Sequence, residues 1–324
     1  MDRRNFITLL GGAAATWPGQ TYAQQRRPAR IGVLHPFAPP HPWTTGLRRG
    51  LRDLGYVEGQ TIAIDERGSD GRYERLDGLA RELVDSKVDV LVVMTGPALR
   101  AARQRTATVP IVMAVSSDGV GTVGVASLAR PGGNVTGLTL MGPDLTGLRL
   151  SLLKDAVPAA KRIAVLYNPA EQPTAEELRQ TEVAAGKLGV VLQPVETRSG
   201  DALDQAFASA VSGGADASIT FTHGFALLNR SRIAALAVQH RLPAMYAWRE
   251  FAEAGGLMAY GPNTADTLYR AASFVDRIIK GGNPAEMPIE QPTKFELVIN
   301  LKTAKALGLE IPAALLVRAD VVIE

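Results

Sequence analysis

Hydroxyl, carboxylate and aromatic side chains recur where short apolar runs of the sequence end. Thr95, Ser116 and Ser117 follow such runs, and hydroxyls beside free backbone N–H groups hold carboxylates and other anions. Asp118 offers a carboxylate that would pair with an ammonium group. Aromatic rings, which stack on flat apolar groups, occur at comparable places. This set of side chains suits a small, partly polar solute such as an amino acid or an aromatic acid.

The candidate ligand-binding residues lie at the predicted carboxyl ends of strands, with one further tyrosine beyond them. They are His35, Trp43, Thr95, Gly96, Ser116, Ser117, Asp118, Tyr167, Asn168, His223, Tyr246 and Tyr260. Several have a purely structural alternative. Ser116 and Ser117 are also typical caps of a following turn, and Asp118 is typical of an Asx-turn. Tyr246 also suits the core, with its hydroxyl on a backbone group.

No motif of a catalytic or metal centre accompanies these residues. Residues 119–124 spell G-x-G-x-x-G, but they follow the fourth predicted strand instead of the first, which argues against a dinucleotide site. There is no P-loop, no G-x-S-x-G elbow and no H-E-x-x-H motif. His35 and His41 are close in sequence but have no Cys beside them. We therefore expect no cofactor and no metal. A triad of Ser117, His223 and Asp118 can be drawn, but nothing in the sequence orients it.

The composition is that of a globular protein with two domains. The chain has 324 residues, of which 46% are hydrophobic and 21% are charged. The formal net charge is only +3, and the charges are interspersed, so we expect no nucleic-acid partner. There is no cysteine, which excludes disulfides, thiol nucleophiles and a lipid anchor on cysteine.

Residues 1–23 have the features of a signal peptide. Arg3 and Arg4 form a positive start, residues 6–15 are an apolar run, and Ala23 is the small residue that a signal peptidase prefers. The run is shorter than the ~20 apolar residues that cross a bilayer. Residues 3–7 also resemble a twin-arginine signal, with an ordinary secretion signal as the alternative. The sequence thus predicts an exported, periplasmic protein.

The chain contains an internal duplication. Apolar, β-branched runs followed by helical periodicity occur in the first half, and similar runs follow in the same order in the second half. The offsets between matching points are nearly equal. The matches pair Arg30 with Arg162, Gly55 with Gly189, Asp89 with Asp216, and Pro110 with Pro243. Gly55 and Gly189 each follow a predicted helix, where glycine supplies a left-handed C-cap.

Strand–helix alternation with short loops predicts parallel sheets with helices on both faces. The duplication then gives an α/β fold of two doubly wound parallel-sheet lobes joined by a hinge. In such sheets ligands bind beyond the carboxyl ends of the strands, so two facing lobes enclose one cleft. Closure of the lobes on the ligand is the expected motion, and two rigidly packed domains without a functional cleft are the alternative.

Three long segments carry a resemblance to a known family. They are residues 127–137, residues 251–261 and residues 292–309. They resemble the signatures of the ABC-transporter substrate-binding proteins related to tryptophan-binding TrpX, and the similarity covers essentially the whole chain after residue 23. The resemblance implies a type I periplasmic-binding fold, with three strands crossing the hinge. The family usually has Asp-Pro where this chain has Asp118-Gly119. That loop faces the ligand, so the resemblance does not fix the substrate, and aromatic amino acids are one option.

The expected organisation follows from the duplication and the resemblance together. Residues 24–140 form an N-terminal lobe completed by about 262–283, and residues 141–261 form a C-terminal lobe completed by about 284–324.

The predicted function is to capture a small polar or aromatic solute and deliver it to an ABC permease in the inner membrane. The alternatives are a periplasmic sensor that presents the solute to a membrane receptor, a cytoplasmic ligand-sensing regulator, and an enzyme on the same scaffold. A regulator would need an N-terminal helix-turn-helix, where this chain has the signal segment. We expect a monomer, because hinge closure needs free lobes.

Overall fold

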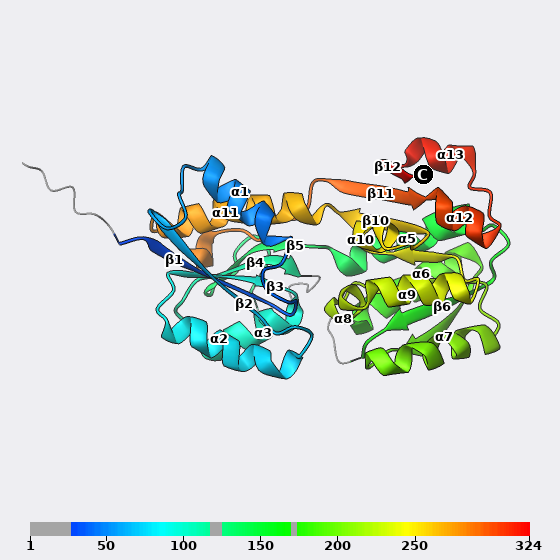
Figure 1. Cartoon of the computed structure of the whole chain (residues 1–324), viewed down its shortest axis with the longest axis horizontal. Coiled ribbons are helices and arrows are strands. Elements are labelled where there is room, and N and C mark those ends of the chain that lie inside the picture. Colours follow the sequence, from blue (N-terminus) through cyan, green and yellow to red (C-terminus); the bar gives the residue numbers. More distant parts are fainter. Residues whose placement is uncertain (1–26, 117–124, 170–173) are drawn as a thin grey trace, which may run out of the picture.

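The computed structural model describes residues 27–116, 125–169 and 174–324 (Figure 1). Two α/β lobes lie next to one another along the long axis of the molecule (Figure 1). The predicted signal peptide, Ser117, Asp118 and the G-x-G-x-x-G segment lie outside the described residues. No helix in the described ranges combines the length and the apolar character needed to cross a membrane.

The first lobe is built on a five-stranded sheet of order β2-β1-β3-β4-β5, and all of its strand pairs are parallel. The strands are β1 (Ala29–His35), β2 (Ile62–Gly68), β3 (Val90–Met94), β4 (Ile111–Ser116) and β5 (Val135–Thr139). The helices of this lobe are α1 (Thr44–Asp53), α2 (Leu76–Asp85), α3 (Gly96–Arg105) and α11 (Thr264–Ile279). One face of the sheet packs on α2 and α3, and the other packs on α1 and α11.

The second lobe repeats this strand order and adds two strands at one edge. Its sheet has the order β12-β11-β10-β9-β8-β6-β7, in which only β10 and β11 pair antiparallel. The strands are β6 (Arg162–Tyr167), β7 (Val191–Glu196), β8 (Ala217–Thr220), β9 (Ala244–Tyr246), β10 (Met258–Pro262), β11 (Phe295–Asn300) and β12 (Val321–Ile323). Read from β7 to β10, the order matches that of the first lobe. The predicted duplication and the two-lobed α/β fold are therefore confirmed.

The helices of the second lobe include four short ones near the cleft and the C-terminus. The helices are α5 (Gly142–Ala156), α6 (Thr174–Leu188), α7 (Leu203–Ser212), α8 (Gly224–Leu228), α9 (Arg230–Gln239), α10 (Arg249–Glu253), α12 (Leu301–Leu307) and α13 (Ala313–Arg318). The predicted C-cap glycines are confirmed, because Gly55 follows α1 with φ 89° and Gly189 follows α6 with φ 64°.

The chain crosses between the lobes three times. The crossings lie between β5 and α5, between β10 and α11, and between Glu290 and β11. Residues 284–290, which we expected in the C-terminal lobe, lie along the first sheet instead. The reason is that the backbone N–H groups of Ile289 and Glu290 donate to the carbonyls of Leu128 and Gly137. The expected boundary after residue 283 is therefore too early.

Helix α11 returns from the second lobe and packs closely on α1. A Cβ atom at Gly50 would lie 2.4 Å from the Tyr269 carbonyl oxygen, and one at Gly46 would lie 2.8 Å from the Ala265 carbonyl oxygen. Both are backbone atoms, which cannot rotate away. The close packing of the two helices therefore depends on these glycines, and it ties the returning segment to the first lobe.

We expect Gly50→Ala to lower the free energy of unfolding by about 1–3 kcal/mol, because the added methyl group forces the two helix backbones apart. Urea unfolding followed by circular dichroism measures this. Gly78→Ala in α2 is the matched control, because a Cβ there meets nothing within 4 Å. The control should be neutral or slightly stabilising. Equal stability of the two variants would contradict the close packing.

Candidate functional site

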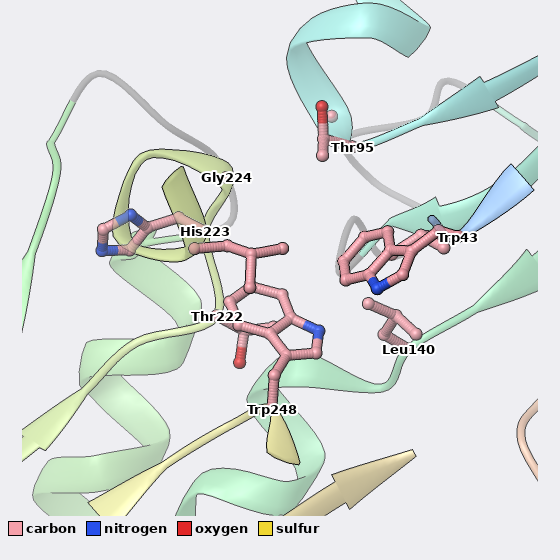
Figure 2. Close-up of a pocket in the computed structure, with 10 residues that line it drawn as sticks. Trp43, Thr95, Leu140, Thr222, His223, Gly224 and Trp248 are labelled. Atoms are coloured by element: carbon pink, nitrogen blue, oxygen red, sulfur yellow. The ribbon is translucent and has the colours of Figure 1, made fainter. Parts of the chain in front are cut away.

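A small cavity lies between the lobes at the carboxyl ends of both sheets (Figure 2). Its first-lobe lining is Trp43, Thr95, Gly96, Val115 and Leu140, and its second-lobe lining is Thr222, His223, Gly224, Leu227 and Trp248. The room inside is about 10 Å³, the space of a single water molecule. One continuous apolar cluster runs from the first lobe into the second and includes Trp43, Leu140, Leu227 and Trp248. The two lobes are therefore packed together around the cavity.

Thr95 enters this cavity from the junction of β3 and α3. Its backbone has φ 79° and ψ 155°, which is rare for a residue other than glycine, and its amide donates to the Val115 carbonyl. Such strained conformations concentrate at functional sites. The side chain is only 7% exposed, and its Oγ1 atom has no hydrogen-bond partner among the described residues. Thr95 therefore places an available hydroxyl beside the first N–H groups of α3, which are themselves unpaired within the helix.

Trp248 supplies a second available polar group. It follows β9, its ring is 4% exposed, and its Nε1 atom has no partner among the described residues. An indole N–H is a donor only, and burying it without an acceptor is unfavourable. The cavity thus combines two indole faces with a hydroxyl and an N–H that have no partner within residues 27–116, 125–169 and 174–324. This combination suits a ligand with an apolar ring and hydrogen-bonding ends.

The side chain of His223 caps the helix that begins beside the cavity. Its Nδ1 atom accepts a hydrogen bond from the Ala226 amide at 3.2 Å, which caps the start of α8. Burial lowers the pKa of His223 to about 3, so the ring is neutral at physiological pH. Figure 2 shows the ring pointing away from Trp43 and Trp248, so the residue lines the cavity mainly with its backbone.

A buried ion pair lies directly behind the second-lobe wall of the cavity. Arg149 and Glu177 are 1% and 2% exposed, and Arg149 Nη1 lies 3.8 Å from Glu177 Oε1. Both bond to Thr222: its amide donates to Glu177 at 3.1 Å, and its hydroxyl lies 3.0 Å from each partner. Arg149 Nε also donates to the Tyr260 carbonyl at 2.8 Å, next to a crossing segment. Burial lowers the pKa of Arg149 to about 10 and raises that of Glu177. The network fixes Thr222 relative to α5, α6 and β10.

Arg149→Met should destabilise the protein by about 3–5 kcal/mol, because it leaves the Glu177 carboxylate buried without its partner. Thermal unfolding measures the loss. The double variant Arg149→Met/Glu177→Leu is the control, and it should recover most of the stability because no uncompensated charge remains. If the single variant were as stable as the wild type, the ion pair of Arg149 and Glu177 would not stabilise the second-lobe wall of the cavity.

The structure brings four of the predicted residues into the cavity and places the six other described ones elsewhere. Trp43, Thr95, Gly96 and His223 line it. His35 is buried and bonds to Glu66, and Tyr246 is buried and stacks on Phe251. Tyr167 bonds to Glu196, Asn168 lines a different groove, and Tyr260 stacks on Phe295. Ser116 lies at the end of β4 next to the cavity residue Val115, and its carbonyl accepts from Leu140.

Trp248 is the main residue that the sequence reasoning missed. The sequence puts Tyr246 among the candidate residues at the carboxyl ends of strands. The strand β9 ends at Tyr246, which turns inward, so the loop residue Trp248 reaches the cavity instead. The apolar lining by Leu140 and Leu227 carries no signal in the sequence, because such residues are equally typical of a core.

The chain is similar to known proteins of one family. Residues 41–323 match the model of the family described as ABC transporter substrate binding protein. The chain therefore belongs to that family, which is a family of binding proteins and not of enzymes. The predicted resemblance is confirmed.

Individual relatives are similar over most of the chain. A tyrosine-binding protein from Clostridioides difficile is 27% identical over 268 residues, which are 82% of this chain and 76% of the relative. The crystal structure of an ABC domain from Streptococcus pneumoniae in complex with L-Trp is 25% identical, covers 91% of this chain and 100% of its own, and has a TM-score of 0.85. A leucine-binding protein from Thermotoga maritima is 16% identical, covers 86% of this chain and 87% of its own, and has a TM-score of 0.61. The last likeness concerns the fold alone and confirms the type I periplasmic-binding architecture.

Proposed function

We propose that this chain is an exported receptor that captures an aromatic amino acid between its lobes and delivers it to an ABC permease in the inner membrane. The observation that carries the proposal is a pair of buried polar atoms in a largely apolar cavity, Thr95 Oγ1 and Trp248 Nε1, which have no hydrogen-bond partner among the described residues. Burying such groups costs free energy unless a ligand pairs with them. The tyrosine-binding relative and the solved complex with L-Trp support the same ligand class.

The ends of an amino acid fit different parts of the site. Its carboxylate would bond to the Thr95 hydroxyl and the first N–H groups of α3, where the helix dipole also favours negative charge. Its ring would pack on the indoles of Trp43 and Trp248, with Leu140 and Leu227 completing the apolar wall. Asp118 remains our predicted partner for the ammonium group, although it lies outside the described residues.

Binding requires the lobes to separate first. A cavity of about 10 Å³ holds one water and not an amino acid. The three crossing segments are short, so a change in their backbone angles would move one lobe relative to the other as a body. The free protein would then bind as a monomer by opening and closing, without a chemical step. The predicted periplasmic location depends on residues 1–23, which the described ranges do not include.

Isothermal titration calorimetry on the chain from Gln24 onward tests this proposal. L-tyrosine or L-tryptophan should bind, and tyramine, which has the ring but lacks the carboxylate, should bind far more weakly. Thr95→Val keeps the shape of the side chain and removes the hydroxyl. It should weaken binding of the amino acid by about tenfold, the value of one lost hydrogen bond.

Thr108→Val is the control, because Thr108 is exposed on the first lobe and does not line the cavity. This variant should bind the amino acid with the affinity of the wild type. Unchanged affinity in Thr95→Val, or equal binding of tyramine and L-tyrosine, would contradict the proposed carboxylate site. Absence of binding by every aromatic amino acid would contradict the ligand class.

A further inference from the structure

A second, larger cavity adjoins the first on the other side of Trp43. Its volume is about 410 Å³, and its lining includes His41, Trp43, Leu227, Arg230 and Glu250. Trp43 and Leu227 also line the inner cavity. These two side chains, one from each lobe, therefore form the wall between the outer and the inner cavity. The exposed Ser231 also lines the outer cavity, which places it at the surface of the molecule.

The indole of Trp43 is held in this wall by a hydrogen bond that crosses the cleft. Trp43 Nε1 donates to Glu250 Oε1 at 2.8 Å, and Glu250 lies in the first turn of α10 in the second lobe. The other carboxylate oxygen of Glu250 is buried and has no hydrogen-bond partner among the described residues. Burial raises the pKa of Glu250. The indole N–H is thus an important polar contact of a poorly solvated carboxylate.

The backbone that carries Trp43 is anchored within the first lobe. Glu66 Oε1 accepts from the His41 amide at 2.9 Å and lies 2.9 Å from His35 Nε2. Phe37 packs against the Trp43 ring with centroids 5.2 Å apart. Because this loop is fixed to its own lobe, the wall opens when the lobes separate and the bond to Glu250 breaks.

We propose that Glu250 is a positioning residue that holds Trp43 as a gate between the outer cavity, through which the ligand enters, and the inner binding cavity. The role of the outer cavity as the entrance rests on the proposed function. The cross-cleft bond itself does not depend on that proposal. Breaking it joins the two cavities, and re-forming it closes the inner cavity behind the ligand.

Acrylamide quenching of fluorescence tests the gate without a ligand. In the chain from Gln24 onward with Trp248→Phe, Trp43 is the one remaining tryptophan. Glu250→Ala in this background should clearly raise the quenching constant, because the ratio of open to closed gate rises by about tenfold when a hydrogen bond to a charged group is lost. Glu250→Gln keeps an acceptor oxygen and should give a smaller rise.

Asp276→Ala is the matched control. The Tyr56 hydroxyl donates to Asp276 at 2.9 Å, an aromatic–carboxylate bond that lies within the first lobe. Quenching of Trp43 should not change in this variant. Equal quenching in Glu250→Ala and its parent would overturn the gate, whatever the chain binds.

Stopped-flow dissociation of L-tyrosine from chains that retain Trp248 then tests the entrance. Glu250→Ala should release L-tyrosine about tenfold faster than the wild type. Unchanged dissociation would overturn the role of the gate in ligand exchange. If quenching rises in Glu250→Ala but the wild type does not bind L-tyrosine, the result supports the role of Glu250 in holding Trp43 and contradicts the proposed function.

Discussion

Each loop that lines the cavity begins where a parallel strand ends. In a parallel sheet the carboxyl ends of all strands lie at one edge, and the following helices begin there with unpaired N–H groups. The duplicated unit puts two such edges face to face. Thr95 and Gly96 follow β3 in one lobe, and Thr222 to Gly224 follow β8 at the equivalent place in the other. The position and much of the polarity of the site follow from this arrangement of the sheets.

The two walls of the site are made rigid in different ways. The first-lobe wall rests on the loop that Glu66 anchors, where hydrogen bonds from His35, His41 and Arg48 outweigh burial and lower the pKa of Glu66 to about 2. The second-lobe wall rests on the buried pair of Arg149 and Glu177. Both are costly to build, because charges are removed from water. A receptor that closes as two rigid bodies needs such walls, since the geometry of the closed cavity must be reproduced at every closure.

The sequence predicted the fold more fully than the site. The repeated pattern from Arg30 and from Arg162 was enough to predict two parallel sheets, because the order of strands and helices is a local signal. Thr95 was found because it follows a strand. Trp248 was missed because its place depends on where β9 ends. The sequence also did not show that the Tyr246 ring turns inward, because that turn is set by packing against Phe251. The bond between Trp43 and Glu250 joins residues far apart in the chain, and no local pattern reports it.

The proposed function requires that the cleft hold an aromatic amino acid with its carboxylate at Thr95. A crystal structure of the chain from Gln24 onward, grown with L-tyrosine, tests it most directly. We expect the ligand ring to lie against the indoles of Trp43 and Trp248, with the carboxylate in hydrogen-bond contact with Thr95 Oγ1 and the start of α3. A ligand bound outside the cleft, or bound with its carboxylate directed away from Thr95, would contradict it.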